Sequence, residues 1–524
     1  MRKLALSLLL LPTLAAADLG AGDAAFENLT IPMIDSAPEP TIGINWQTNH
    51  VFYHAGSTTI RYAPEIEGDG RWVDVTPPYQ VPTNLDPMLI VHEETGRMLA
   101  GGLLGACSIM MISDDDGETW IPSANMCSGA QFDHQSVGLG FKPGEGSLAS
   151  LVSELNGYYC GQLGEIGCSV SIDGGVTWTL PTPHLGSCGG FHGHWRVSSV
   201  TGNAFLPVPG CGSQHGLMVP TVLTEELGGV TGLLFEERLV EGSHEWDGGF
   251  DSSIGVSRES GFVYYGMADR RGARMAISED EGESWDTLGP NDDTTWLDVG
   301  QFHEPAILAA TFADVQAGDD DRAAFSFIGI EATGDPAIDE HLKTNAIYSC
   351  YNKGEGEGEW AGGFPINQSD MVWHYYVAYT YDRGASWDVE RISDDPVQVG
   401  GVYDSVTDSS GGCRNLLDFN DMDIDSAGRV HIAYADGCTG DCAAANPVDA
   451  PSQTGYRDRA PRMFRQTDGR GLFAAADIDT PIAPPLEEPA PESESPVQDS
   501  SGAVAAGWLL LMLGFGWMRR STRR

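Results

Sequence analysis

Basic residues are scarce in this sequence. Lys and Arg together number 28 against 75 Asp and Glu, and the formal net charge at pH 7 is −47. Six of the basic residues lie near the two ends of the chain, so the region between them is more acidic still. Contacts to nucleic acid phosphates need a basic surface, which excludes nucleic acid as a partner. The acidity instead suits a saline habitat, solubility, or Ca²⁺ binding in Asp-rich loops such as Gly318–Arg322.

The sequence also lacks helical periodicity. No long stretch repeats its apolar residues with the 3.6-residue period of an amphipathic helix. The chain instead contains 66 glycines and 30 prolines among its 524 residues. This composition indicates many short strands joined by many turns.

The ten cysteines include no CxxC pair, so a metal site built from thiolates is not favoured. Most of them lie close together along the chain, which predicts local disulfides in an oxidising compartment. The close pairs are Cys107/Cys127, Cys160/Cys168, Cys188/Cys211 and Cys438/Cys442, and Cys350 and Cys413 remain.

An eight-residue pattern, (Ser/Thr)-x-Asp-x-Gly-x-(Thr/Ser)-Trp, occurs four times. Its Asp can accept hydrogen bonds from amides of a tight turn, its Gly permits a positive φ, and its Trp supplies a large apolar ring. We therefore expect these residues to have a structural role in hairpins. The copies are Ser113–Trp120, Ser171–Trp178, Ser278–Trp285 and Thr380–Trp387, with the structural residues Asp115, Trp120, Asp173, Trp178, Asp280, Trp285, Asp382 and Trp387.

The pattern resembles the Asp-box of the sialidase-like (BNR-repeat) β-propellers. The resemblance implies an all-β propeller of four-stranded blades over residues 38–475, with each box between the third and fourth strands. Uneven spacing of the boxes implies degenerate copies, as at Arg61–Glu65, Thr224–Gly228 and Arg465–Gly469, and an insertion at about 331–372 in one blade.

The inner strands of the blades allow the blades to be counted. Segments with turn residues between two β-forming stretches predict seven blades, with six as the alternative. The segments are Thr41–Ala55, Pro87–Gly102, Ser136–Glu154, Trp195–Pro207, Ser252–Met267, Pro305–Ile330 and Phe419–Ala435.

The two ends predict an exported protein. Residues 1–17 have the basic, apolar and small-residue parts of a secretory signal peptide. Residues 476–502 form an acidic Pro/Ser-rich linker that cannot build a core. Residues 503–524 are a short apolar segment followed by an Arg cluster, which resembles bacterial C-terminal sorting tails; the alternative is a plain membrane anchor. We expect the propeller at the cell surface, associated with the outer membrane, or secreted.

Function is expected on the face opposite the boxes. In a four-stranded up-and-down blade, the start of the first strand and the boxes lie on opposite faces. Polar residues gather where the inner strands start, and inner strands surround the central axis, so these side chains are expected to converge at one mouth. They are Asp86, Asp133, His134, His192, His194, Asp251, His303, Glu304, Asp418, Asn420 and Asp421. The alternative is a hydrogen-bonded, water-filled channel without a ligand.

Some of these residues are candidate metal ligands. His192 and His194 are two residues apart, which on a strand places both side chains on one face, as chelation requires. With His303 they form the candidate ligand set for a transition metal or Ca²⁺.

The same face is expected to carry long loops, among them residues 156–167, with aromatic side chains such as Trp373 that could flank a sugar. The resemblance to sialidases implies an arginine triad for a substrate carboxylate, for which Arg196, Arg271 and Arg414 are candidates, and a Tyr nucleophile, for which Tyr456 is the candidate. The first blade reads Glu39-Pro-Thr-Ile-Gly43 and lacks the Arg-Ile-Pro motif of that family.

These residues leave three candidate functions. The first is a surface-retained propeller that binds an extracellular glycan or protein through its loop-rich face, with His134 among the binding residues. The second is a glycoside hydrolase of the exo-sialidase type, with Asp133, Asp251 and Glu304 as candidate carboxylates. The third is a metal-dependent hydrolase built on His134, His192, His194 and His303.

Overall fold

The computed structural model describes most of the chain between residues 24 and 477. The described residues are 24–78, 85–104, 107–124, 126–127, 133–143, 155–163, 165–189, 191–212, 214–225, 229–240, 251–288, 295–345, 347, 371–402, 415–444 and 456–477. The expected signal peptide, linker and C-terminal anchor lie outside them.

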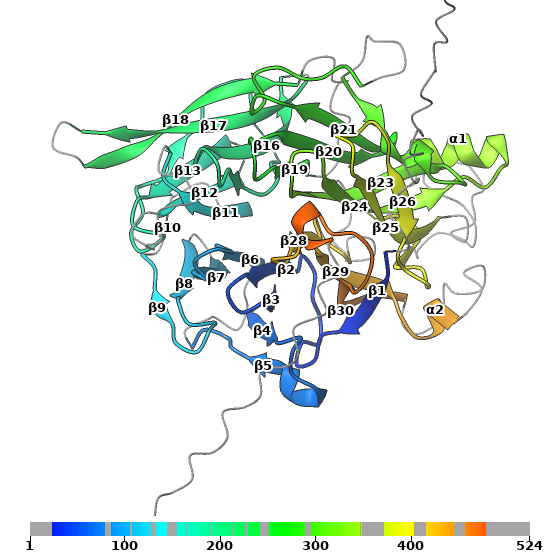
Figure 1. Ribbon diagram of the computed structural model, residues 1–524, viewed down its shortest axis with the longest axis horizontal. Helices are drawn as coiled ribbons and strands as arrows, with labels where there is room; N and C mark the ends of the chain where they lie inside the picture. Colours follow the sequence, from blue (N-terminus) through cyan, green and yellow to red (C-terminus); the bar gives the residue numbers. More distant parts are fainter. Residues whose placement is uncertain are drawn as a thin grey trace, which may run out of the picture. The chain divides into compact units, whose positions relative to one another are not determined.

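Seven antiparallel sheets form the seven blades of a β-propeller, as predicted (Figure 1). Blades 2 and 6 each carry one further short strand. The blades are, in order, β2 (Thr41–Asn45), β3 (His50–Ala55), β4 (Thr58–Tyr62) and β5 (Trp72–Asp74); β6 (Leu85–Val91), β7 (Met98–Leu104), β8 (Cys107–Ser113), β9 (Ile121–Pro122) and β10 (Met126–Cys127); β11 (Asp133–Phe141), β12 (Leu155–Leu163), β13 (Glu165–Ser171) and β14 (Thr182–Pro183); β15 (Arg196–Val197), β16 (Ala204–Cys211), β17 (Gln214–Thr224) and β18 (Val230–Leu239); β19 (Ser253–Val256), β20 (Val263–Asp269), β21 (Gly272–Ser278) and β22 (Leu297–Asp298); β23 (Ile307–Ala317), β24 (Ala323–Glu331), β25 (Val372–Thr380), β26 (Asp388–Arg391) and β27 (Gln398–Val399); and β28 (Asp421–Ile424), β29 (Val430–Cys438), β30 (Tyr456–Gln466) and β1 (Phe26–Thr30).

The first strands of the blades surround the central axis. Each of the strands β2, β6, β11, β15, β19, β23 and β28 contacts its counterpart in the next blade, and β28 contacts β2. The ring is therefore closed, and the residues at the starts of these strands lie around one opening.

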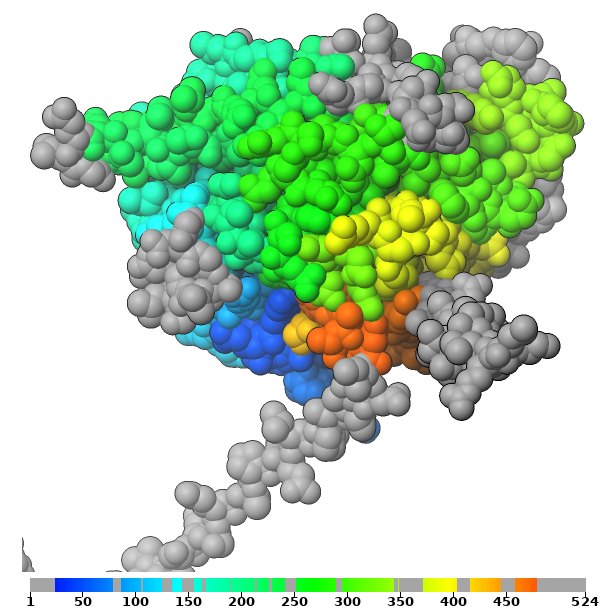
Figure 2. All heavy atoms as spheres, turned by 45° about the horizontal axis from the view of Figure 1, so that its top comes forward, coloured from blue at the N-terminus to red at the C-terminus, as the bar shows by residue number. Residues whose placement is uncertain are grey.

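The ring is closed by strands from both ends of the described chain. β1 pairs antiparallel with β30 and supplies the outermost strand of blade 7, with Phe26 opposite Gln466. The N-terminal blue segment and the C-terminal orange segments lie side by side in Figures 1 and 2. The propeller thus begins upstream of the expected boundary at residue 38.

The core consists of apolar layers between blades instead of one central cluster. Each of seven clusters of buried side chains is formed by the facing sides of two neighbouring blades. The central axis is consequently left to polar side chains, because the apolar faces of the sheets are already buried against one another.

The Asp-boxes connect the third and fourth strands of blades 2, 3, 5 and 6. In the first box, Asp115 accepts hydrogen bonds from the Thr119 amide at 2.8 Å and the Thr119 hydroxyl at 2.6 Å. The Trp120 indole N–H donates to the Val75 carbonyl of blade 1 at 2.9 Å. Gly117 has a φ of +81°, and a Cβ there would lie 2.7 Å from Val75, so the box requires glycine. The boxes therefore hold each turn against the preceding blade.

Disulfides pin several loops, as the cysteine spacing predicted. Cys160 is bonded to Cys168, Cys188 to Cys211, and Cys438 to Cys442 at α2 (Asp441–Ala444). Cys107 is also disulfide-bonded, and Cys127 lies opposite it in the strand register. Cys350 and Cys413 lie outside the described residues.

One of the predicted long loops is a pair of strands instead. Residues 156–167 are not a long loop: they form most of β12 and the start of β13, and Tyr158 and Tyr159 are buried there between blades.

The insertion in blade 6 contains α1 (Pro336–Asn345). Within the described residues, none of the helices has the length and hydropathy needed to cross a membrane.

We expect removal of a box carboxylate to weaken the fold. In the third box, Asp280 accepts hydrogen bonds from the Ser278 hydroxyl and from both the amide and hydroxyl of Ser284. Asp280→Ala should lower the free energy of unfolding by about 1–2 kcal/mol in chemical denaturation.

The matched control is Glu283→Ala in the same box, where an exposed carboxylate lies 3.7 Å from Arg238. An exposed ion pair contributes less than about 1 kcal/mol. Equal losses for the two variants would show that the box carboxylate has no special structural role.

Candidate functional site

The candidate site is the mouth of the central channel, where the inner strands start. Several residues at this mouth have left-handed backbone conformations, with φ of 51° at Glu39, 46° at Asp86, 54° at His134 and 57° at Phe312. Such a conformation costs roughly 1–3 kcal/mol for a non-glycine residue, and it concentrates at functional sites. Register shifts accompany it near the starts of β6 and β11 and within β23.

The inner strands need acceptors for backbone N–H groups that face the axis. Side chains of the preceding blade provide these acceptors at several points around the ring. The bonds run from Ile42 N to Asp421 at 2.9 Å, Met422 N to Asp314 at 2.6 Å, Val315 N to Ser253 at 3.1 Å, Trp195 N to Ser136 at 2.8 Å and His134 N to Asp86 at 3.0 Å. Short Asp and Ser side chains thus join neighbouring blades at the axis.

His134 and Asp251 form a buried ion pair at the mouth. The His134 Nε2 lies 2.6 Å from an Asp251 carboxylate oxygen and 2.8 Å from the His192 carbonyl. Burial alone would lower the pKa of His134, but the carboxylates of Asp251, Asp418 and Glu39 outweigh it and raise the pKa to about 10. The imidazole therefore carries a positive charge at neutral pH.

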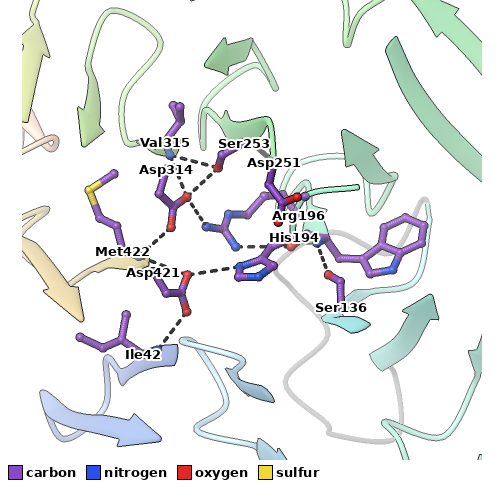
Figure 3. A network of polar contacts seen from close by, with 12 residues as sticks. Ile42, Ser136, His194, Arg196, Asp251, Ser253, Asp314, Val315, Asp421 and Met422 are labelled. Atoms are coloured by element: carbon purple, nitrogen blue, oxygen red, sulfur yellow. Dashed lines mark hydrogen bonds and ion pairs between the residues drawn. The ribbon is translucent and has the colours of Figure 1, made fainter. Parts of the chain in front are cut away.

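A second group of charges lies beside this pair (Figure 3). The Arg196 guanidinium donates to Asp314 at 3.0 Å, and His194 Nδ1 lies 3.5 Å from Asp421. Asp314 and Asp421 both accept a hydrogen bond from the Met422 amide, so their carboxylates are adjacent. Burial and the Asp421 charge raise the pKa of Asp314 to about 6, whereas His194 and Arg196 outweigh burial at Asp421 and lower its pKa.

A cavity of about 100 Å³ extends along the axis from these charges. Its polar walls include Thr41, Gln135, His194, Arg196 and Asp421. Asp423, two residues after Asp421 on β28, also lines it, since alternate strand residues share a face. Such a cavity has room for several water-sized groups.

Side chains from three blades meet at the other end of the channel, on the Asp-box side. Arg258 lies over the ring of Trp46, with its Cζ 4.2 Å from the centroid, and forms ion pairs with Glu93 and Glu94. These groups come from blades 5, 1 and 2, so they cross the axis.

Electrostatically the mouth and channel are acidic. More carboxylates than cationic groups face the axis near the mouth. The acids are Glu39, Asp86, Asp251, Asp314, Asp418, Asp421 and Asp423, and the bases are His134, His194 and Arg196.

Aromatic rings border the same mouth. Phe191 lies edge-on to His134 with ring centroids 5.2 Å apart, and Phe419 lies edge-on to His194 at 4.5 Å. Apolar ring surface thus lies beside hydrogen-bonding groups. That combination suits a ligand with both a C–H face and hydroxyl groups.

The three candidate metal ligands have different surroundings. His192 and His194 precede β15 instead of lying on it: the ring of His192 lies 5.4 Å from that of His134, whereas His194 is paired with Asp421. His303 bonds the Pro305 carbonyl at 2.8 Å and lies against Tyr376 of β25. Among the described residues, no group of three or more His, Cys, Asp or Glu could hold a metal ion.

The Asp-rich loop Gly318–Arg322 is held by protein groups. Asp320 accepts hydrogen bonds from Ser257 and Ser260, and Asp319 accepts one from the Ala474 amide. These bonds join the turn between β23 and β24 to blade 5 and to the end of the described chain.

The remaining predicted residues are dispersed. Glu304 is exposed in the loop before β23, and Arg271 pairs with Asp269 in the turn between β20 and β21. Trp373 is fully buried in the core between blades 6 and 7, where its indole N–H donates to the Gly400 carbonyl at 2.8 Å. Asp133 begins β11 and Tyr456 begins β30, whereas Arg414 lies outside the described residues.

Asp314 and Asp423 lie in the channel but were not among the predicted residues. In blade 6 the polar residues predicted at the start of the inner strand were His303 and Glu304. The strand instead reaches the channel only after a register shift between Thr311 and Asp314. Asp423 could have been found, because it follows Asp421 at the period of two that places side chains on one face of a strand.

The fold and this site define a seven-bladed β-propeller with an acidic axial channel. No protein-family model matches the sequence, and no curated protein matches it. Membership of the sialidase-like family therefore stays a prediction from the turn motif.

Several solved structures are similar to the chain at low identity. A lectin from Aleuria aurantia in complex with Fucα1-6GlcNAc is 12% identical with a TM-score of 0.38, over 68% of this chain and 96% of the lectin. A Dyadobacter fermentans protein of unknown function is 11% identical with a TM-score of 0.38, over 84% and 98% of the two chains. AofleA from Arthrobotrys oligospora is 10% identical with a TM-score of 0.36, over 72% and 93%. Similarity at this level carries no inference about ligand or activity, because fold does not imply function.

The buried His134–Asp251 pair predicts a pH-dependent stability. The pKa of His134 in the folded protein, about 10, lies above its ordinary value of 6.5. Its contribution to stability is therefore fully present below pH 6.5 and is lost as the pH rises towards 10. Removing the charge with His134→Gln should lower the free energy of unfolding by about 3–5 kcal/mol at pH 6, because the variant leaves a buried carboxylate unpaired.

The loss should shrink as the pH is raised, and denaturation of both proteins at several values between pH 6 and 10 measures it. His303→Gln, at a histidine outside the channel, is the control for loss of an imidazole. A loss in His134→Gln that stays constant across this range contradicts the assignment of a charged His134.

Proposed function

We propose that the protein binds a glycan at the mouth of its axial channel. The observation that carries this proposal is the convergence of polar side chains from six blades on one small cavity, with Phe191 and Phe419 packed against His134 and His194 at the mouth. Sugar recognition requires such a set of directional donors and acceptors beside an apolar surface.

The charge of the mouth indicates which glycans fit. A sialylated glycan would bring a carboxylate to a site where carboxylates already outnumber cationic groups. Among the described residues, Arg196 is the arginine near the channel mouth, and its guanidinium is already paired with Asp314. The site therefore favours neutral or positively charged sugars over acidic ones.

The disulfides support a location outside the cytoplasm, where such bonds persist. We accordingly propose that the propeller is exported and meets an extracellular glycan, with the apolar C-terminal segment as its membrane attachment.

Glycan binding can be tested with an array of neutral, amino-bearing and sialylated glycans. We expect binding to neutral or amino-bearing members, and His194→Ala should weaken it about 10-fold or more, because the variant removes a hydrogen-bonding group at the mouth. Arg383→Ala, at an exposed box residue on the opposite face, is the control and should bind like the parent protein. Binding restricted to sialylated glycans would contradict the proposal.

One observation favours glycoside hydrolysis as a second function. Asp314 and Asp421 are adjacent carboxylates whose environments shift their pKa values in opposite directions, as an acid and base pair requires. Asp314 would hold the proton and Asp421 would remain ionised near neutral pH.

Hydrolysis can be tested with aryl glycosides of neutral sugars. If the pair acts in this way, Asp421→Asn should abolish turnover, and hydrolysis by the parent protein should fall as the pH rises above about 6, where Asp314 loses its proton. Turnover that survives in Asp421→Asn would rule out this pair.

A further inference from the structure

One carboxylate of the channel is held by backbone amides without an ion pair among the described residues. It belongs to Asp423, since both of its carboxylate oxygens accept hydrogen bonds from backbone amides, those of Ile44 and Ile424, each at 2.8 Å. No ion pair within the described part of the chain reaches Asp423. Burial raises its pKa to about 7 and outweighs Arg196; Arg196 and Arg258 lie near Asp423 but are ion-paired with Asp314 and with Glu93 and Glu94.

Two neighbouring charged side chains, those of Asp421 and Arg196, also line the cavity. Asp421 lies two residues before Asp423 on the same strand. The Arg196 guanidinium is bonded to Asp314. A cationic group that entered the cavity would thus meet Asp423, which has no ion pair among the described residues, and Asp421, which has His194 Nδ1 at 3.5 Å.

An unpartnered polar group lines the same cavity. Thr41 is only 3% exposed, and its hydroxyl oxygen is buried without a hydrogen-bond partner among the described residues. Thr41 lines the cavity together with Asp421 and Asp423, and the amide of the next residue, Ile42, donates to Asp421. A buried polar group of this kind is rare unless a ligand or water completes its bonding.

These groups match the bonding needs of an ammonium group. A primary ammonium has three N–H donors and no acceptor. Asp421, Asp423 and Thr41 supply two carboxylates and one hydroxyl oxygen. A metal ion is a poorer match, because no group of three or more His, Cys, Asp or Glu within the described residues could hold one.

We propose that the channel selects glycans whose sugars carry free amino groups, with the sugar ammonium bound between Asp421, Asp423 and Thr41. This inference rests on the proposed glycan-binding function and names its ligand class. An acetylated amine fits poorly, because the acetyl group removes the charge, leaves one N–H donor and adds bulk in a cavity of about 100 Å³.

The inference also predicts release of protons on binding. Asp423, with a pKa of about 7, is partly protonated near neutral pH, and an ammonium beside it would lower that pKa. The other polar or charged groups beside Asp423 and the cavity include Glu93, Gln135, His194, Arg196, Arg258, Gln316 and Asp421, contributed by blades 2 to 7. Proton exchange by any of these groups would be measured in the same experiment, and the Asp423 variant separates it.

The test is isothermal titration calorimetry of the purified full-length protein with two tetrasaccharides. One is the β1-4 tetramer of glucosamine and the other is the same tetramer fully N-acetylated. At about pH 6.5 we expect the glucosamine tetramer to bind at least 10-fold more tightly, and more weakly as salt is added. In buffers with different heats of ionisation, its binding should release protons.

Two variants test the residues, and one is a control. Asp423→Asn should reduce the preference for the amino tetramer to less than about 3-fold and abolish most of the proton release. Thr41→Val keeps the charges and the side-chain shape, and it should weaken binding of the amino tetramer several-fold. Glu279→Gln, an exposed acid on the box face, should behave like the parent protein.

Equal affinity for the two tetramers would overturn the inference while leaving glycan binding intact. A lysine tetrapeptide that binds as tightly as the glucosamine tetramer would show that the site reads an ammonium group but not a sugar, which also overturns it. Failure to bind either tetramer or any glycan on the array would overturn the proposed function itself.

Discussion

The unpaired inner edges of the first strands constrain the whole molecule. Each first strand has a strand neighbour on its outer side only, so its other row of N–H groups points to the axis. Buried N–H groups need acceptors, and a neighbouring blade can supply them only through side chains. Short acceptors fit the distance, which explains why Asp314, Asp421, Ser136 and Ser253 lie where the blades meet. The bonds that hold the ring together are therefore also the source of its polar axis.

This solution brings carboxylates close to one another in a poorly hydrated space. Hydrogen bonds from backbone amides offset part of the cost, and cationic partners offset another part at Asp251 and Asp314. Asp423 accepts hydrogen bonds from amides but has no ion pair among the described residues, since the nearby Arg196 and Arg258 are paired with other acids. The contrast between these neighbours divides the axis into groups that are satisfied within the protein and a group that is not. A ligand is expected to bind at Asp423, because a cationic group there would supply the ion-pair partner that the protein does not.

Much of the architecture was predictable from local pattern. The Asp-boxes required a turn with glycine in a left-handed conformation and an apolar ring, and the inner strands of most blades began where polar residues preceded β-forming runs. Blade 6 was different because Phe312 adopts a left-handed conformation inside β23, which an aromatic residue rarely does and no sequence pattern signals. The polar residues chosen there, His303 and Glu304, lie seven or more residues too early to reach the axis. Trp373 was predicted beside a ligand and is instead buried in the core. No local pattern distinguishes a core aromatic residue from an exposed one beside an insertion.

The closure of blade 7 has a consequence for how the ring forms. β1 pairs with β30 across almost the whole described chain, and contacts between such distant residues form slowly. During synthesis the first six blades can assemble in order, but the last sheet waits for β28, β29 and β30 to meet a strand made at the beginning. Until then, β30 has a free edge able to pair with another chain. In a circular permutant that joins the two ends of the propeller and opens the chain between β17 and β18, blade 4 instead of blade 7 would be the last to be completed. The last blade to be completed is thus set by where the chain is cut, while the finished ring stays the same.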